Sequence, residues 1–261
     1  MKKILLFLLF PTLAHAGTMS IYGTAFTIQI TTPVAASASA DTIVFDTSTV
    51  STTVSYANPC QWTVNIGNGS SASDKVAVLA CASLGTSHVT SADIGGTSFV
   101  MQQRTNNSAG NGSTSEIWTA ANPPTGSQTV TVHVNTGNCG GVGEVTCTVA
   151  DFTGVKQATP VDVSTGAVGA TVQTVSAVRS TTVDKDYIIS VGGNDYSGVT
   201  LSDGSSQTVL ANVHNTVNGY NSAQAYKGAI TPAGSTTITW NAVGGINSQM
   251  TACWAALQPG P

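Results

Sequence analysis

The sequence predicts an all-β protein, an antiparallel β-sandwich of the jelly-roll type. Apolar and polar residues alternate with a period of two in several short segments, and no window keeps a helical period beyond a turn or two. Because successive side chains of a strand point to opposite faces, each such segment has one buried face and one wet face. The alternating segments are 26–30, 62–66, 130–134, 145–149 and 238–240.

Turn signals separate these segments at short intervals. Glycine tolerates the positive φ angles that tight turns require, and asparagine often precedes it there. Short alternating runs divided by such turns are typical of sandwiches and jelly rolls. The turn dipeptides are Asn68-Gly69, Gly95-Gly96, Asn111-Gly112, Gly192-Gly193, Asn218-Gly219 and Gly244-Gly245.

Residues 1–16 predict a secretory signal peptide. Lys2 and Lys3 precede an apolar run over 4–10, and Ala14-His15-Ala16 fits the small-residue cleavage site. The run is far shorter than the roughly 20 apolar residues that span a bilayer. We therefore expect cleavage after Ala16, a secreted or cell-surface protein, and no membrane span.

Residues 17–41 predict an N-terminal strand followed by a linker. Residues 18–30 contain the first alternating segment, and 31–41 are rich in alanine and serine, as linkers often are. One interpretation makes 18–30 an edge strand of the same sandwich. The alternative is that this strand pairs with a neighbouring subunit by adding to an open sheet edge. The β-sandwich domain is then 42–261.

The composition argues against nucleic acid as a partner. Only 8% of the 261 residues are charged, 41% are hydrophobic, and the formal net charge is −4. Loss of Lys2 and Lys3 with the signal leaves 6 basic residues, widely spaced, against 12 acidic ones. Binding to a phosphate backbone requires clustered Lys and Arg. The polarity comes from Thr, Ser, Asn and Gly, as in durable exported β proteins.

Five cysteines in an exported chain imply two disulfides and one free thiol. Cys139 and Cys147 flank a glycine-rich loop able to reverse the chain, so we predict that they pair. Cys60 and Cys81 would lie opposite one another in a hairpin and form the second bridge. Cys253 is then a buried free thiol, although a Cys81–Cys253 pair is the main alternative. No cysteine spacing supports a zinc site.

Catalytic signatures are missing from the sequence. There is no G-x-S-x-G motif, His88 and His214 lie in polar loop-like sequence, and His133 alternates with valines and should face solvent. Asp151 is the leading carboxylate candidate for a glycosidase, but a strand-end role bonding backbone amides is the simpler interpretation. We predict no enzyme, no catalytic residue and no cofactor.

The aspartates of 184–203 make a calcium site an alternative. Exported sandwiches often fix loops with calcium, and carboxylate oxygens are its preferred ligands. The spacing matches no EF-hand or other calcium-binding repeat, so the sequence predicts no metal site and leaves calcium as an alternative. The aspartates are Asp184, Asp186, Asp195 and Asp203.

The best candidate for ligand binding is the polar, aromatic region 193–227. Aromatic faces stack on the C–H groups of sugars, and planar amides bond pairs of hydroxyl groups. The same residue types are also ordinary in loops, which is the alternative interpretation. The candidates are Asn194, Tyr196, Asn218, Tyr220, Asn221 and Tyr226, with Asn212 beside them.

Several stretches together resemble a known protein module. They are CQWTVNIGNGSSASDKVAVLACASL over 60–84, IGGTSF over 94–99, EIW and NPPTG over 116–126, FTGV with ATPVD over 152–162, and WAALQP over 254–259. This pattern resembles an uncharacterised β-sandwich module of secreted bacterial and phage-associated proteins. The resemblance covers about 42–259 and implies a fold, not an activity. The five cysteines and the segment 17–41 depart from the pattern.

The sequence thus favours a non-catalytic exported module that binds glycan or another cell-surface polymer. The alternative is a structural subunit of an extracellular assembly, such as a surface filament or virion appendage, that self-assembles through its N-terminal strand. A third hypothesis is a hydrolase whose acid pair is not visible in the sequence.

Overall fold

The computed structural model describes residues 18–21, 24–27, 42–51, 57–67, 74–107, 112–139, 144–196, 198–215, 219–244 and 246–260. The chain divides into two compact units, 1–39 and 40–261. In the first, β1 (Thr18–Ile21) and β2 (Thr24–Thr27) pair with each other as an antiparallel hairpin. This hairpin replaces the single strand expected over 18–30. The predicted signal peptide and linker lie outside the described residues.

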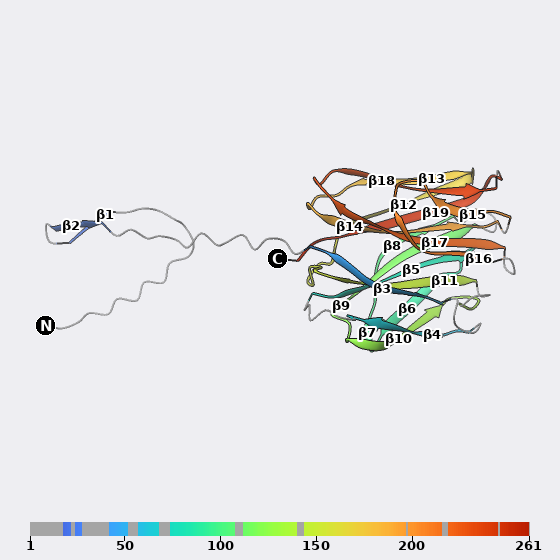
Figure 1. Ribbon diagram of the computed structural model, residues 1–261, viewed down its shortest axis with the longest axis horizontal. Coiled ribbons are helices and arrows are strands. Elements are labelled where there is room, and N and C mark those ends of the chain that lie inside the picture. Colours follow the sequence, from blue (N-terminus) through green and yellow to red (C-terminus); the bar gives the residue numbers. More distant parts are fainter. Residues whose placement is uncertain are drawn as a thin grey trace. The chain divides into compact units, whose positions relative to one another are not determined.

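The second unit is built from four antiparallel sheets, which Figure 1 shows stacked in layers. Sheet I has the order β4 (Cys60–Ile66), β10 (Gly126–Val134), β6 (Val89–Ile94), β7 (Thr97–Ser98). Sheet II has the order β3 (Val44–Val50), β11 (Val145–Thr153), β5 (Val76–Leu84), β9 (Ser113–Ala121), β8 (Val100–Asn106). Sheet III has the order β12 (Val161–Val172), β19 (Ser248–Leu257), β14 (Asp186–Asn194), β17 (Tyr220–Ile230), β16 (Thr208–Asn215). Sheet IV has the order β13 (Thr174–Ser180), β18 (Ser235–Val243), β15 (Thr200–Asp203).

Three hydrophobic cores fill the three spaces between these layers. Trp62 and Leu79 belong to the core between sheets I and II, and Trp240 and Trp254 to the core between sheets III and IV. Phe152 belongs to the core between sheets II and III. In the outer sheets β4 alternates, with every second residue buried, whereas β11 and β19 of the inner sheets are buried on both faces. The wet face expected for 145–149 is therefore wrong, because this segment belongs to β11. Both patterns follow from the number of layers that cover each sheet.

The two halves of this unit, 42–155 and 156–260, have the same strand order. When the strands of each half are numbered one to eight in chain order, with the short β7 left out, sheets II and III both read 1-8-3-6-5. Sheets I and IV both read 2-7-4. This interleaving of first and last strands is the jelly-roll arrangement. The predicted fold class is confirmed, but where one sandwich was expected over 42–261 the unit contains two, joined through sheets II and III.

The sequence carries traces of the same duplication. Pro124-Thr-Gly-Ser127 joins β9 to β10, and Pro232-Ala-Gly-Ser235 joins β17 to β18 at the equivalent place. The dipeptides Asp74-Lys75 and Asp184-Lys185 precede the equivalent strands β5 and β14. These matches lie at equivalent places in the two halves and accompany their shared strand order.

The contact between the two sandwiches changes character along its length. At one end it is apolar, where Phe152 of sheet II and Leu257 of sheet III belong to the same core. At the other end hydroxyl groups meet, and the Thr251 hydroxyl lies 3.0 Å from that of Ser113 and 2.8 Å from that of Ser115. Buried hydroxyls need such partners to offset their desolvation. The contact therefore combines apolar burial with specific polar bonds.

Both predicted disulfide pairings are wrong, although the four predicted cysteines are the bridged ones. The bridges are Cys60–Cys139 and Cys81–Cys147, with Cα–Cα distances of 5.7 and 4.1 Å. The expected hairpin does not exist, because β4 pairs with β10 in sheet I while β5 pairs with β11 in sheet II. Cys147 lies directly opposite Cys81 in that register. Cys253 is free and buried, as predicted, and burial raises the pKa of its thiol.

Candidate functional site

The predicted ligand-binding region is largely occupied by its own internal bonds. Asn194, Tyr220 and Asn221 are fully buried. The Asn194 amide bonds the Ser248 hydroxyl, the Tyr220 hydroxyl bonds Thr146, and the Asn221 amide donates to the Tyr196 carbonyl at 2.6 Å. These three residues were wrongly predicted as ligand contacts, because their strands lie in sheet III and have both faces covered.

The other polar candidates of this region do not form a common site. Tyr196 has 42% of its surface exposed and lies just after β14. The exposed Asn212 donates its side-chain amide to the Leu201 carbonyl. Asn218 lies outside the described residues. Tyr226 alone among the candidates belongs to a larger aromatic group.

Four aromatic rings from four strands form what we call the aromatic cluster. Phe45 of β3 and Phe152 of β11 come from the first sandwich, and Tyr187 of β14 and Tyr226 of β17 come from the second. Phe152 is fully buried, and the other three are partly exposed. The cluster therefore lies where the contact between the sandwiches meets solvent.

The rings have a definite order. Tyr226 stacks on Phe45 with centroids 4.9 Å apart and on Tyr187 at 5.5 Å, with interplanar angles of 23° and 24°. Phe152 is tilted by 58° against both Phe45 and Tyr187, at 5.7 Å from each. Tyr226 is thus stacked against both Phe45 and Tyr187 within the cluster. Burial, and then the neighbouring Tyr226, raise the pKa of the Tyr187 hydroxyl.

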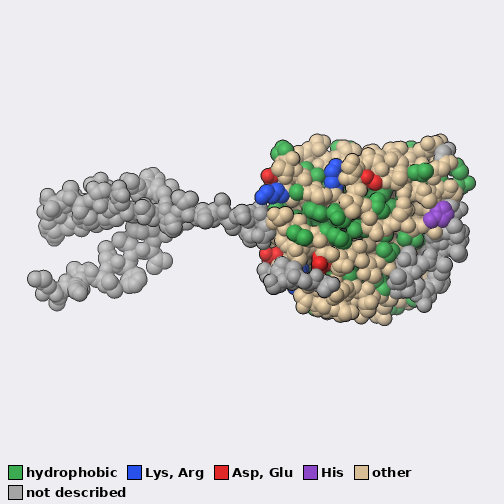
Figure 2. All heavy atoms as spheres, in the orientation of Figure 1, with side chains coloured by type: hydrophobic (Ala, Val, Ile, Leu, Met, Phe, Trp, Pro, Cys, Tyr) green, Lys and Arg blue, Asp and Glu red, His purple; other side chains and the backbone are tan. Residues whose placement is uncertain are grey.

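Apolar side chains extend this surface along the neighbouring edge strands. Leu210 packs against the same core as the cluster, and Val44 and Val209 are 53% and 44% exposed. Figure 2 shows apolar side chains gathered on one face, at the level where Figure 1 places β3 and β17. A contiguous apolar patch at a protein surface is typical of a contact site.

A pair of carboxyl groups lies beside the cluster in the chain. Asp186, which precedes Tyr187, is fully buried and hydrogen-bonded to the Asp162 carboxylate. Burial, then the bond and charge of Asp162, then the charge of Asp184, raise the pKa of Asp186 to about 8. Burial alone would raise the pKa of Asp162, but bonds from Thr182 and Asp186 outweigh it and lower that pKa.

Asp151 has the structural role that the sequence suggested. It is fully buried and accepts a hydrogen bond of 2.6 Å from the backbone N–H of Gly67 at the end of β4. Burial raises its pKa to about 6, with Asp46 adding to the shift and Lys75 opposing it. A buried carboxyl group that accepts a hydrogen bond from a backbone N–H fixes the end of the strand that donates it.

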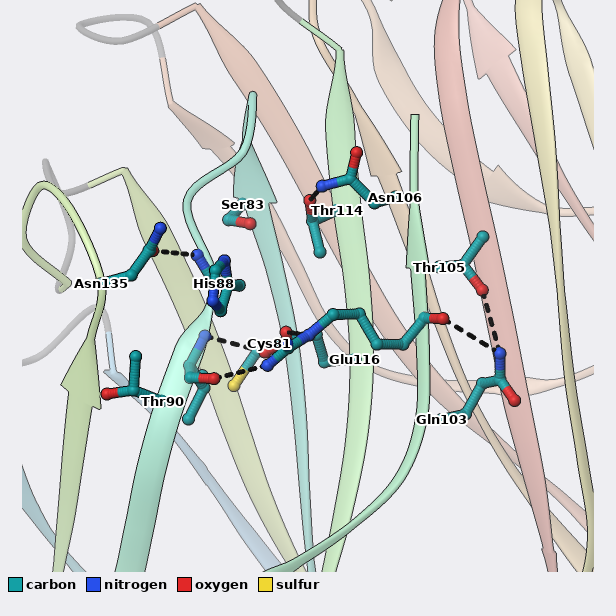
Figure 3. A network of polar contacts seen from close by, with 12 residues as sticks. Cys81, Ser83, His88, Thr90, Gln103, Thr105, Asn106, Thr114, Glu116 and Asn135 are labelled. Carbon is teal, nitrogen blue, oxygen red and sulfur yellow. Dashed lines mark hydrogen bonds and ion pairs between the residues drawn. The ribbon is translucent and has the colours of Figure 1, made fainter. Parts of the chain in front are cut away.

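A second buried carboxylate, Glu116, was not singled out by sequence reasoning. It pairs with Arg104 and accepts the N–H of Val89 at 3.0 Å and the Trp118 indole N–H at 3.4 Å. Figure 3 shows Glu116 with these contacts, and Cys81 lies opposite it in the β5–β9 pair. Burial raises the pKa of Glu116, while Arg104 acts against the shift. This network ties sheet I to sheet II and leaves Glu116 inaccessible.

The histidines and the calcium candidates are dispersed. His133 and His214 are exposed, and His88 is partly exposed with its backbone N–H bonded to Asn135. Asp195 accepts the Gln249 N–H, and Asp203 closes its own turn through Ser205 and Gln207. Within the described ranges, no three His, Cys, Asp or Glu side chains gather in a group able to hold a metal ion.

A shallow groove lies at the opposite edge strands of sheets II and III. It has a volume of about 350 Å³ and is lined by Val100 and Gln102 of β8 and by residues 157–161. Here the edges are closed by direct contact, because the Ser164 hydroxyl of β12 donates to the Gln102 carbonyl at 2.9 Å. The opposite edge of sheets II and III, at β3 and β16, is the one beside which the aromatic cluster lies.

No known protein family, curated protein or solved structure matches this chain. The resemblance to a secreted bacterial and phage-associated module thus stays a prediction. In the part of the chain that the structure describes, no helix has the length and apolar character needed to cross a membrane.

Proposed function

We propose that this protein is an exported, non-catalytic module that binds a glycan through the aromatic cluster. The observation that carries the proposal is the partial exposure of Phe45, Tyr187 and Tyr226 at the contact between two rigid sandwiches. Binding residues held by a rigid scaffold need little reordering when a ligand arrives.

The chemistry of the cluster suits a neutral polysaccharide. The outer ring faces of Phe45 and Tyr187 offer flat apolar surfaces for sugar C–H groups, and the tyrosine hydroxyls offer polar edges. Only 8% of residues are charged, so recognition of a strongly charged polymer has little support. The carboxylates Asp151 and Glu116 are buried in structural bonds, which favours binding over hydrolysis.

The test is a glycan array probed with the protein and two variants. Phe45→Ala combined with Tyr187→Ala removes both outer faces and should abolish the signal. Tyr196→Ala is the matched control, since that tyrosine is exposed outside the cluster and its backbone bonds to Asn194 and Asn221 survive the change. Equal binding by all three proteins, or no binding by any, would overturn the proposal.

The alternative is a structural subunit that assembles through its N-terminal segment. It is favoured by the β1–β2 hairpin, which belongs to a separate compact unit. Size-exclusion chromatography with light scattering would compare the chain from Gly17 with a chain from Asp41. Assembly of the longer chain alone supports the subunit function, and two monomers exclude it.

A further inference from the structure

We propose that Asp162 and Asp186 share one proton, and that loss of this proton at alkaline pH disorders the aromatic cluster through Tyr187. Neither oxygen of the buried Asp186 accepts a hydrogen bond from an N–H or hydroxyl group among the described residues. Val161 of β12 and Tyr187 of β14 both lie opposite Leu257 of β19, which brings Asp162 and Asp186 to the same strand end. Asp162 is the group with which Asp186 shares a hydrogen bond, so Asp186 donates the proton between them. Two carboxylates in contact cannot both remain ionised without a cation.

The surroundings fix which member holds the proton. Asp162 accepts the backbone N–H groups of Thr182 at 2.6 Å and Val183 at 3.3 Å, and also the Thr182 hydroxyl. Hydrogen bonds from N–H and O–H groups stabilise a charged carboxylate, so Asp162 is the anion. Asp186 has no such donors and is the neutral acid.

The charges around Asp186 act in one direction. Asp162 on β12 and Asp184 in the turn before β14 both oppose its ionisation. The Lys227 ammonium of the adjacent β17 is bonded elsewhere, since it donates to the Ser205 carbonyl at 3.1 Å. The backbone N–H of Lys185, in the turn before β14, bonds the Ile230 carbonyl of β17. Once Asp186 ionises, repulsion from both acids drives it out of its buried position.

The link to the aromatic cluster is the backbone of β14. Tyr187 follows Asp186 directly, at a shift of register between β14 and β17 that lies between Asp186 and Ile188. A displaced Asp186 therefore moves the residue whose ring stacks on Tyr226. Tyr187 is also the outer ring of that stack, so the surface proposed for ligand binding changes with it.

Near-UV circular dichroism of the ligand-free protein between pH 5 and pH 9 tests this device. The wild-type aromatic signal should change reversibly with a midpoint near the pKa of about 8. Asp186→Asn keeps a donor to Asp162 without a titratable proton, so its signal should show no transition near pH 8. Asp184→Asn is the control and should keep the transition, moved to lower pH. A flat wild-type titration, or an unchanged transition in Asp186→Asn, would overturn the proposal.

Carbon-13 NMR of the aspartate carboxyl groups tests the shared proton in the wild-type protein, without a variant. One carboxyl carbon should titrate near pH 8, and titration of all aspartates below pH 6.5 would contradict the device. Only the effect on ligand binding rests on the proposed function. Because both titrations are done without ligand, they can succeed even if the protein binds no glycan.

Discussion

Replacement of Phe152 by alanine should destabilise the protein strongly, because this ring joins the two sandwiches at their apolar end. It is fully buried and contacts rings from both halves. A buried aromatic side chain removes about 150–250 Å² from water, which at about 25 cal/mol per Å² corresponds to about 4–6 kcal/mol. Measured Phe→Ala changes in cores cost about 3–5 kcal/mol, and we expect about 4 kcal/mol here.

Urea unfolding followed by tryptophan fluorescence measures this change. All four tryptophans are buried, Trp62 and Trp118 in the first sandwich and Trp240 and Trp254 in the second, so the emission reports both halves. Phe45→Ala removes a partly exposed ring of the same cluster and should cost only about 1–2 kcal/mol.

The difference between the two variants is the informative quantity. If Phe152→Ala costs less than about 1 kcal/mol, or no more than Phe45→Ala, the ring does not hold the sandwiches together and the described contact is wrong. Phe152→Leu should restore most of the stability, since it refills the greater part of the cavity.

Two further predictions concern packing and covalent structure. Gly192→Ala should destabilise by about 1–3 kcal/mol in the same unfolding assay, because an added Cβ would lie 2.7 Å from the buried Trp240 ring. Gly234→Ala meets open space and should change stability by less than about 0.5 kcal/mol; equal effects would contradict the described core. Digestion of the unreduced protein with trypsin and a protease that cuts after Glu144 should yield separate peptides joined by the Cys60–Cys139 and Cys81–Cys147 bridges. A peptide joining Cys139 to Cys147 would refute this pairing.

The local structure of this chain could be predicted from the sequence, but the way the strands combine could not. Alternation around Trp62 and Val130 identified outer strands correctly, because one covered face leaves a clear period of two. It did not show that β4 and β5 enter different sheets, which is why the predicted disulfide pairings were wrong. The repeated Pro-x-Gly-Ser turns were the available signal for the duplication.

The candidate site was predicted only in part, for a related reason. Tyr226 was identified from its residue type, but Phe45 and Tyr187 are separated from it by 181 and 39 residues in the sequence. Their contact depends on the packing of sheet II on sheet III, which local patterns do not encode. The same packing buries Tyr220 and Asn221, whose polar character suggested surface loops. The Asp162–Asp186 bond likewise exists only because β12 and β14 flank the same strand end.

Affinity electrophoresis tests the central claim most directly, namely that the aromatic cluster binds polysaccharide. The wild type, the Phe45→Ala and Tyr187→Ala double variant, and Tyr196→Ala would run in native gels with and without the soluble polysaccharide that the array identifies. We predict that the polymer retards the wild type and Tyr196→Ala but not the double variant. Retardation of a folded double variant to the same extent as the wild type would contradict the account.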